Sequence, residues 1–101
     1  MRPIRFHLRV ESDLDDATAY YDEQQTGLGD SFLAEFRATT GMIANIGQVF
    51  RKADGPYRHL KLASYPYLVY YREDTAGFIV TLVINAAREP ALIQSLLGER
   101  R

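Results

Sequence analysis

The stretch from Tyr57 to Pro90 constrains the fold most, because it holds three strand-like runs separated only by short turns. Runs rich in tyrosine and β-branched residues favour strands, and strands with short connections pair antiparallel. Each run also carries an arginine at or near one end, beside tyrosine hydroxyls. Arginines on a sheet can bind phosphate or carboxylate groups, so the functional question is whether this sheet cuts RNA or binds another protein.

The N-terminal part of the chain predicts one strand followed by one helix. Residues Arg5–Val10 alternate between polar and apolar side chains, with Phe6 and Leu8 on the apolar face, which is typical of a half-buried strand. Ser12 stands where a helix cap is expected, and the acidic residues after it suit a helix N-terminus better than a metal site. The helical spacing continues to about Gln25.

A second helix is expected after the turn Gly27-Leu28-Gly29, with Asp30 or Ser31 as its cap and Gly47 at its end. Two helices joined by so short a turn form an antiparallel hairpin. The apolar stripe of the second helix consists of Phe32, Leu33, Phe36, Thr40 and Ile43.

The remaining connections are polar. Asp54-Gly55-Pro56 predicts a loop before the first of the three later strands. Residues Ala91–Leu97 predict a short helical tail, and the four residues after it are expected to be too polar to pack. The predicted class is α+β: a single domain over residues 1–101 in the order β-α-α-β-β-β, with an antiparallel sheet packed against the helical hairpin.

Composition excludes several classes of function. The 101 residues are 47% apolar, enough for one modest core, and the net charge of −1 gives no general attraction to nucleic acid. No cysteine is present, and His7 and His59 lie far apart in sequence, so no metal site and no cofactor are expected. The lack of an apolar run long enough for a signal peptide or membrane span predicts a cytoplasmic protein without membrane contact.

Several short motifs, taken in order, resemble the RelE/ParE superfamily of bacterial type II toxins. The matching pieces are Asp13-Leu14, Tyr20-Tyr21, Gly27-Leu28-Gly29 with Phe32, Tyr57-Arg58-His59-Leu60, Tyr65-Pro66-Tyr67 with Val69, Tyr70-Tyr71, and Ala87-Arg88-Glu89-Pro90. The resemblance implies the same order of strands and helices that the patterning predicts. It also implies a toxin–antitoxin hetero-oligomer in which an extended segment of a cognate antitoxin wraps and blocks the toxin.

The resemblance is closer to the ParE-like branch, whose members poison DNA gyrase and are not nucleases. Tyr20-Tyr21 before Gly-Leu-Gly and the Tyr-Pro-Tyr strand favour this branch. Asn85 also favours it, because the family often has a histidine there, and its absence removes a candidate acid or base. The alternatives are a RelE-like endoribonuclease that cuts mRNA on the ribosome, and an inactive relative that only binds an antitoxin.

The resemblance also implies site residues. If the protein is RelE-like, Arg58 and Arg88 are the candidate catalytic cations and His59 the candidate acid or base. On a strand, however, Arg58 and His59 face opposite sides of the sheet. The expected antitoxin-binding surface lies beside the helical hairpin and comprises Tyr20, Tyr21, Leu28 and Phe32.

Overall fold

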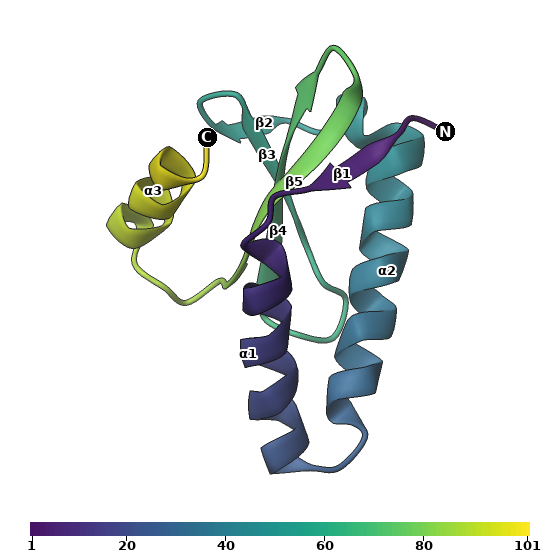
Figure 1. Ribbon diagram of the computed structural model, residues 1–101, viewed down its shortest axis with the longest axis vertical. Helices are drawn as coiled ribbons and strands as arrows, with labels where there is room; N and C mark the ends of the chain where they lie inside the picture. Colours follow the sequence, from purple (N-terminus) through teal and green to yellow (C-terminus); the bar gives the residue numbers. More distant parts are fainter.

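A five-stranded mixed sheet forms the centre of the computed structural model, which describes residues 1–101 (Figure 1). The strand order is β1-β5-β4-β3-β2, and β1 pairs parallel with β5 whereas the other pairs are antiparallel. The predicted α+β class is confirmed. The strands are β1 Ile4–Phe6, β2 Lys52–Asp54, β3 Tyr57–Lys61, β4 Tyr67–Asp74 and β5 Gly77–Asn85.

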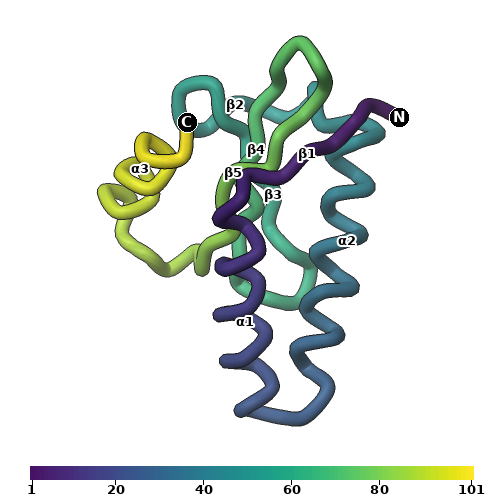
Figure 2. The backbone as a smooth tube through the Cα atoms, viewed as in Figure 1, coloured from purple at the N-terminus to yellow at the C-terminus, as the bar shows by residue number.

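Helices cover both faces of the sheet. The hairpin of α1 (Val10–Gln24) and α2 (Leu28–Ile46) lies on one side, and α3 (Pro90–Glu99) lies on the other, as the backbone trace shows (Figure 2). Gly27, with φ of 95°, turns the chain between α1 and α2, and Gly47 follows the last residue of α2, both as expected. None of these helices has the length and apolar character needed to cross a membrane.

Each face of the sheet has its own apolar core. The larger core packs the helical hairpin against β4 and β5, with Phe32, Tyr71 and Phe78 fully buried. Tyr71 donates a hydrogen bond from its hydroxyl to the Gly47 carbonyl at 2.7 Å, and burial raises the pKa of this tyrosine to about 12. The smaller core lies under α3 and consists of Tyr57, Tyr70, Leu82, Ile84, Ile93 and Leu97.

A β-bulge at Thr81 lets β5 serve both cores. Tyr70 pairs with Leu82 and Tyr71 with Val80, so Thr81 is the extra residue. The bulge reverses the alternation of side chains, which sends Val80 to the hairpin face and Leu82 to the α3 face. Strand β1 pairs with β5 only before this bulge.

The start of the chain differs from the prediction. The strand ends at Phe6 instead of Val10, because the chain turns at His7, where the Val10 amide donates to the His7 carbonyl. Helix α1 therefore begins at Val10, and Ser12 lies inside it instead of capping it. Gly27, not Asp30 or Ser31, is the cap of α2, and the helix begins at once after the turn.

Three further differences lie in the second half of the chain. The predicted loop before β3 contains strand β2, so the sheet gains a fifth strand. Tyr70 and Tyr71 are neighbours on β4 and point to opposite faces, where alternation would leave one of them in solvent, but both are buried because α3 covers the second face. Of the four residues after Leu97 that were expected not to pack, Arg100 does pack, since it lies against Asp13, whereas the other three are exposed.

Candidate functional site

An aromatic cluster joins the turn end of the hairpin to the start of β4. Tyr21 lies at its centre, with ring centroids 4.7 Å from Tyr65, 5.7 Å from Phe32 and 6.0 Å from Tyr67. Tyr20 packs edge-on against Tyr21 and keeps 55% of its surface exposed. The cluster therefore presents an exposed aromatic edge on a rigid, buried base.

The predicted antitoxin-binding residues differ in accessibility. Tyr20 is exposed, whereas Tyr21 and Leu28 are half-buried. Phe32 has no exposed surface, so in this structure it supports the aromatic cluster from beneath and is not available to touch a partner. The resemblance implied all four as one surface beside the hairpin, but it did not distinguish the exposed side chains from the buried ones.

A cleft of about 270 Å³ lies beside this cluster, between α1, α3 and the end of β5. Tyr20 and Tyr67 are among the residues that line the cleft, and burial raises the pKa of the Tyr67 hydroxyl. Arg88 lines the same cleft and is exposed, with no carboxylate close enough to form an ion pair. The cleft therefore offers aromatic surface next to an unpaired cation.

Arg58, by contrast, is engaged inside the protein. Its Nε atom donates to the Phe50 carbonyl at 2.6 Å, and its two Nη atoms donate to the Gln48 carbonyl and the Glu73 carboxylate, each at 3.3 Å. Only 8% of the residue is exposed. Arg58 thus fixes the segment after α2 to the sheet, and this role satisfies most of the donors that would otherwise bind a phosphate.

The three candidate nuclease residues do not come together. His59 pairs with Tyr70 and lies 4.9 Å from its ring centroid, on the α3 side of the sheet, whereas Arg58 faces the hairpin side. Arg58 pairs with Tyr71 on β4, whereas Asn85, the last residue of β5 before Arg88, pairs with Tyr67. Tyr67 and Tyr71 are four residues apart, which corresponds to about 13 Å along the strand. No constellation of acid, base and cation is assembled.

The two arginines should respond differently to truncation. Arg58→Ala removes the donor from two main-chain carbonyls and is expected to lower the free energy of unfolding by about 2–3 kcal/mol. Arg88→Ala, at an exposed position, should change it by less than about 0.5 kcal/mol. Urea unfolding followed by circular dichroism measures both values. Equal stability of the two variants would contradict the structural role of Arg58.

Charged residues at the β4–β5 turn form a second group that the sequence did not reveal. Glu73 accepts from Arg2 at 2.5 Å and from Arg58, and the hydrogen bond from Arg2 is the main cause that lowers the pKa of Glu73. Asp74 bonds Arg5, which lowers the pKa of Asp74 in the same way. These pairs tie the first residues of the chain to the turn, so Arg5 is a structural residue here.

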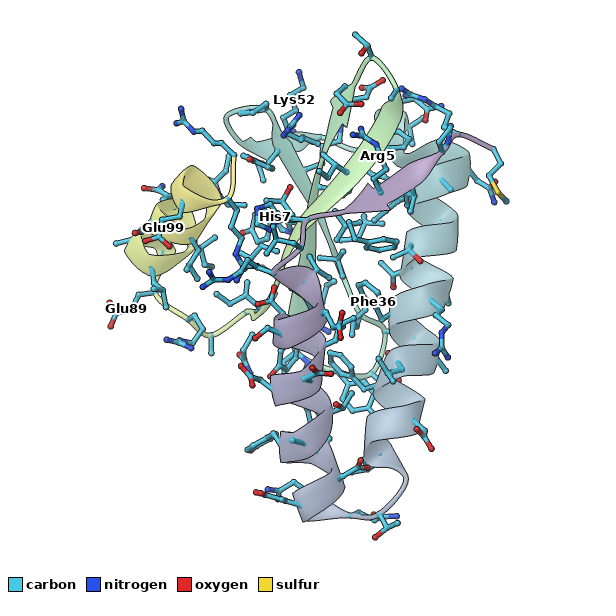
Figure 3. All side chains as sticks on the ribbon, in the orientation of Figure 1. Arg5, His7, Phe36, Lys52, Glu89 and Glu99 are labelled. Carbon is cyan, nitrogen blue, oxygen red and sulfur yellow. The ribbon has the colours of Figure 1, made fainter.

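Asp13 and Arg100 form a largely buried ion pair. Arg100 donates to both carboxylate oxygens of Asp13, at 2.6 and 2.9 Å, and to the Thr81 carbonyl at 3.1 Å. Asp13 also accepts the Val83 amide at 3.0 Å. Nearby, at the end of β1, His7 lies on the side of the sheet that faces α3 (Figure 3), and its burial, together with the charge of Arg100, lowers its pKa.

The arrangement contains no group of three or more side chains that could hold a metal ion. It offers the exposed edge of Tyr20, the unpaired guanidinium of Arg88 and a cleft beside the end of β5. Within this α+β architecture Arg2, Arg5, Arg58 and Arg100 are held in ion pairs.

Comparison with known families agrees with this description. The family model for the ParE toxin of parDE type II toxin–antitoxin systems matches residues 4–90, which include every strand, both hairpin helices and the cleft residues up to Arg88. The chain therefore belongs to the ParE toxin family, and membership implies an antitoxin partner. No individually curated protein matches the chain significantly.

Proposed function

We propose that this protein is a growth inhibitor that acts in the cytoplasm on DNA gyrase, without catalysis of its own, and that a cognate antitoxin neutralises it. Membership of the ParE family supports the class of target, since the ParE-like branch is the one whose members poison gyrase. The observation that carries the proposal further is the dispersal of the candidate nuclease residues described above.

Cleavage of RNA without a metal needs a base, an acid and cations around one phosphate. Arg58 donates its hydrogen bonds to main-chain carbonyls and to Glu73, and His59 lies on the opposite face of the sheet. Arg88 alone remains free, and a single exposed cation suits recognition of a protein carboxylate better than phosphoryl transfer.

Induction of the protein without its antitoxin tests the proposal. The expected result is arrest of DNA replication with a DNA-damage response and intact mRNA, together with inhibition of supercoiling by purified gyrase. Co-expression of the neighbouring antitoxin gene serves as the control and should restore growth. Codon-phased cuts in translated mRNA, with supercoiling unaffected, would assign the protein to the nuclease branch. Absence of both effects, with the antitoxin still bound, would identify an inactive relative.

A further inference from the structure

The outer edge of β1 has no neighbouring strand. Strand β1 is the first strand in the order of the sheet, so only β5 pairs with it. In Figure 1 the strand lies in front of β5, and no helix or strand lies in front of it. An edge strand with unpaired amides and carbonyls is a template for pairing with another chain.

The hydrogen bonds between β1 and β5 show which backbone groups of β1 point outward. At the two ends of the strand, the His7 amide donates to β5 at 2.8 Å and the Pro3 carbonyl accepts from β5 at 3.0 Å. Successive residues of a strand direct their backbone groups to opposite sides, so Arg5, midway between these two residues, also faces β5. The amides and carbonyls of Ile4 and Phe6 therefore all point to the open edge.

These outward groups are self-complementary when a second copy of the chain approaches antiparallel. In that arrangement Ile4 of one copy lies opposite Phe6 of the other, and each of the two pairs exchanges both of its hydrogen bonds. A two-fold axis then passes between the two Arg5 residues, which face each other as a pair without hydrogen bonds between its members. Every outward amide and carbonyl of both strands is satisfied. A parallel copy is offset by one residue, so the outward groups of Ile4 and Phe6 could not all pair with one another.

The charged side chains near this edge are directed away from it. Arg5 bonds Asp74 and Arg2 bonds Glu73, both at the end of β4, so each guanidinium extends inward over the sheet. Charged side chains that remain on an edge strand prevent pairing. Here the two facing Arg5 residues do not bring unpaired charges together, and a net charge of −1 for each chain opposes association little.

Phe6 supplies apolar surface that the single chain leaves exposed. Its ring packs against Phe36 of α2, with ring centroids 6.1 Å apart, yet 46% of the residue is accessible to water. Ile4 points to the same face of the sheet and packs against the larger core. In the antiparallel arrangement Phe6 of one copy lies beside Ile4 of the other, so the exposed part of the ring is covered.

We propose that a second copy of this chain pairs with the outer edge of β1, antiparallel and about a two-fold axis at Arg5, so that two five-stranded sheets become one continuous sheet. A second copy fits because it offers the same free backbone groups and the same half-exposed ring on the other side of the axis. The inference goes beyond the proposed function, since it concerns how the chain associates with itself and does not depend on the target.

Sedimentation equilibrium of the purified protein tests the association. The protein should show a concentration-dependent equilibrium between monomer and dimer, and Phe6→Lys should weaken the dimer by about tenfold or more, because it places a charge on the edge and removes the ring. Val49→Lys is the matched control: it adds the same charge at a residue that is 66% exposed and lies outside β1, and it should change the dimer constant by less than about twofold. A monomer at the concentrations used for NMR, or an unchanged dimer constant in Phe6→Lys, overturns the proposal.

Hydrogen exchange of the unmodified chain tests the backbone contact. The Phe6 amide should exchange about tenfold more slowly in a concentrated solution, in which the dimer dominates, than in a dilute one. The His7 amide, which donates to β5, should be protected in both solutions. Equal exchange of the Phe6 amide at the two concentrations overturns the proposal.

A cysteine at the two-fold axis tests the register. The chain has no cysteine of its own. Facing residues of a pair without hydrogen bonds have Cα atoms about 4.5 Å apart, which is within reach of a disulfide. Arg5→Cys should therefore form a crosslinked dimer in the presence of oxidised glutathione, whereas Lys52→Cys, on the opposite edge strand β2, should remain largely monomeric. Crosslinking of Arg5→Cys that is no greater than that of Lys52→Cys overturns the proposal.

These outcomes are separate from the test of gyrase as target. If the Phe6 amide is protected only when the antitoxin or gyrase is added, the edge belongs to that partner, and the inference is overturned while the proposed function stands. If supercoiling by gyrase is unaffected but Arg5→Cys still forms the crosslinked dimer, the proposed target fails and the dimer stands.

Discussion

Replacement of Asp13 by alanine should lower the free energy of unfolding by about 3–5 kcal/mol, because it leaves the Arg100 guanidinium buried without its partner. The side chains of Asp13 and Arg100 are only 13% and 9% exposed, so water can replace little of the lost contact. The substitution also removes the acceptor of the Val83 amide, which lies beyond the part of β5 that pairs with β1. Urea unfolding of the purified protein measures the loss.

Neighbouring acids provide the control for this prediction. Asp15→Ala, on the exposed side of the same helix, should change stability by less than about 0.5 kcal/mol. The double variant Asp13→Ala with Arg100→Ala should be far less destabilised than the sum of the two single variants, since neither charge is then left unpaired. A loss below about 1 kcal/mol in Asp13→Ala would show that the pair contributes little.

Periodicity predicted those parts of the fold that depend on local sequence. The hairpin of α1 and α2, the turn at Gly27 and the three later strands follow from apolar spacing and from glycine conformations, and each is present. The alternation of Arg5–Val10 misled because Leu8 and Val10 fall in a turn and a helix start, where a short alternating pattern carries no information on length.

Features that join distant parts of the chain could not be predicted in this way. Asp13 and Arg100 are 87 residues apart, and the polar composition after Leu97 favoured an unpacked end. The Thr81 bulge leaves no mark in the alternation of a strand as apolar as β5. The burial of both Tyr70 and Tyr71 depends on α3 covering the second face of the sheet, and a short helical tail in the sequence gave no position for that helix. Strand β2 is three residues long and polar, which a pattern of hydrophobicity cannot distinguish from a loop.

The candidate site was predicted in part. Resemblance to the toxin superfamily selected Tyr20, Tyr21 and Arg88, which lie in or beside the cleft. It also selected Arg58, which donates to the carbonyls of Phe50 and Gln48. Nothing in the sequence pattern indicated these contacts. The sequence did not predict that β5 lacks a neighbouring strand on its outer side beyond Val80, because this depends on where β1 ends.

The aromatic cluster should separate into a structural and a recognition part when its residues are truncated. Phe32→Ala is expected to lower the free energy of unfolding by about 3–5 kcal/mol, since a fully buried ring leaves a cavity that the packed hairpin cannot fill. Tyr20 is 55% exposed, so Tyr20→Ala should lower the free energy of unfolding by less than about 0.5 kcal/mol. The same substitution should weaken binding of the antitoxin several-fold, because it removes a side chain that lines the cleft.

Phe32→Leu distinguishes loss of packing from loss of contact. Leucine retains most of the apolar volume, so this variant should lose only about 1–1.5 kcal/mol and should bind the antitoxin almost as tightly as the unmodified protein does. Tyr20→Phe, which retains the ring, should also bind. If Phe32→Leu remains well folded but loses the antitoxin, the ring of Phe32 must reach the partner through a rearranged cluster, and its assignment as a buried support is wrong.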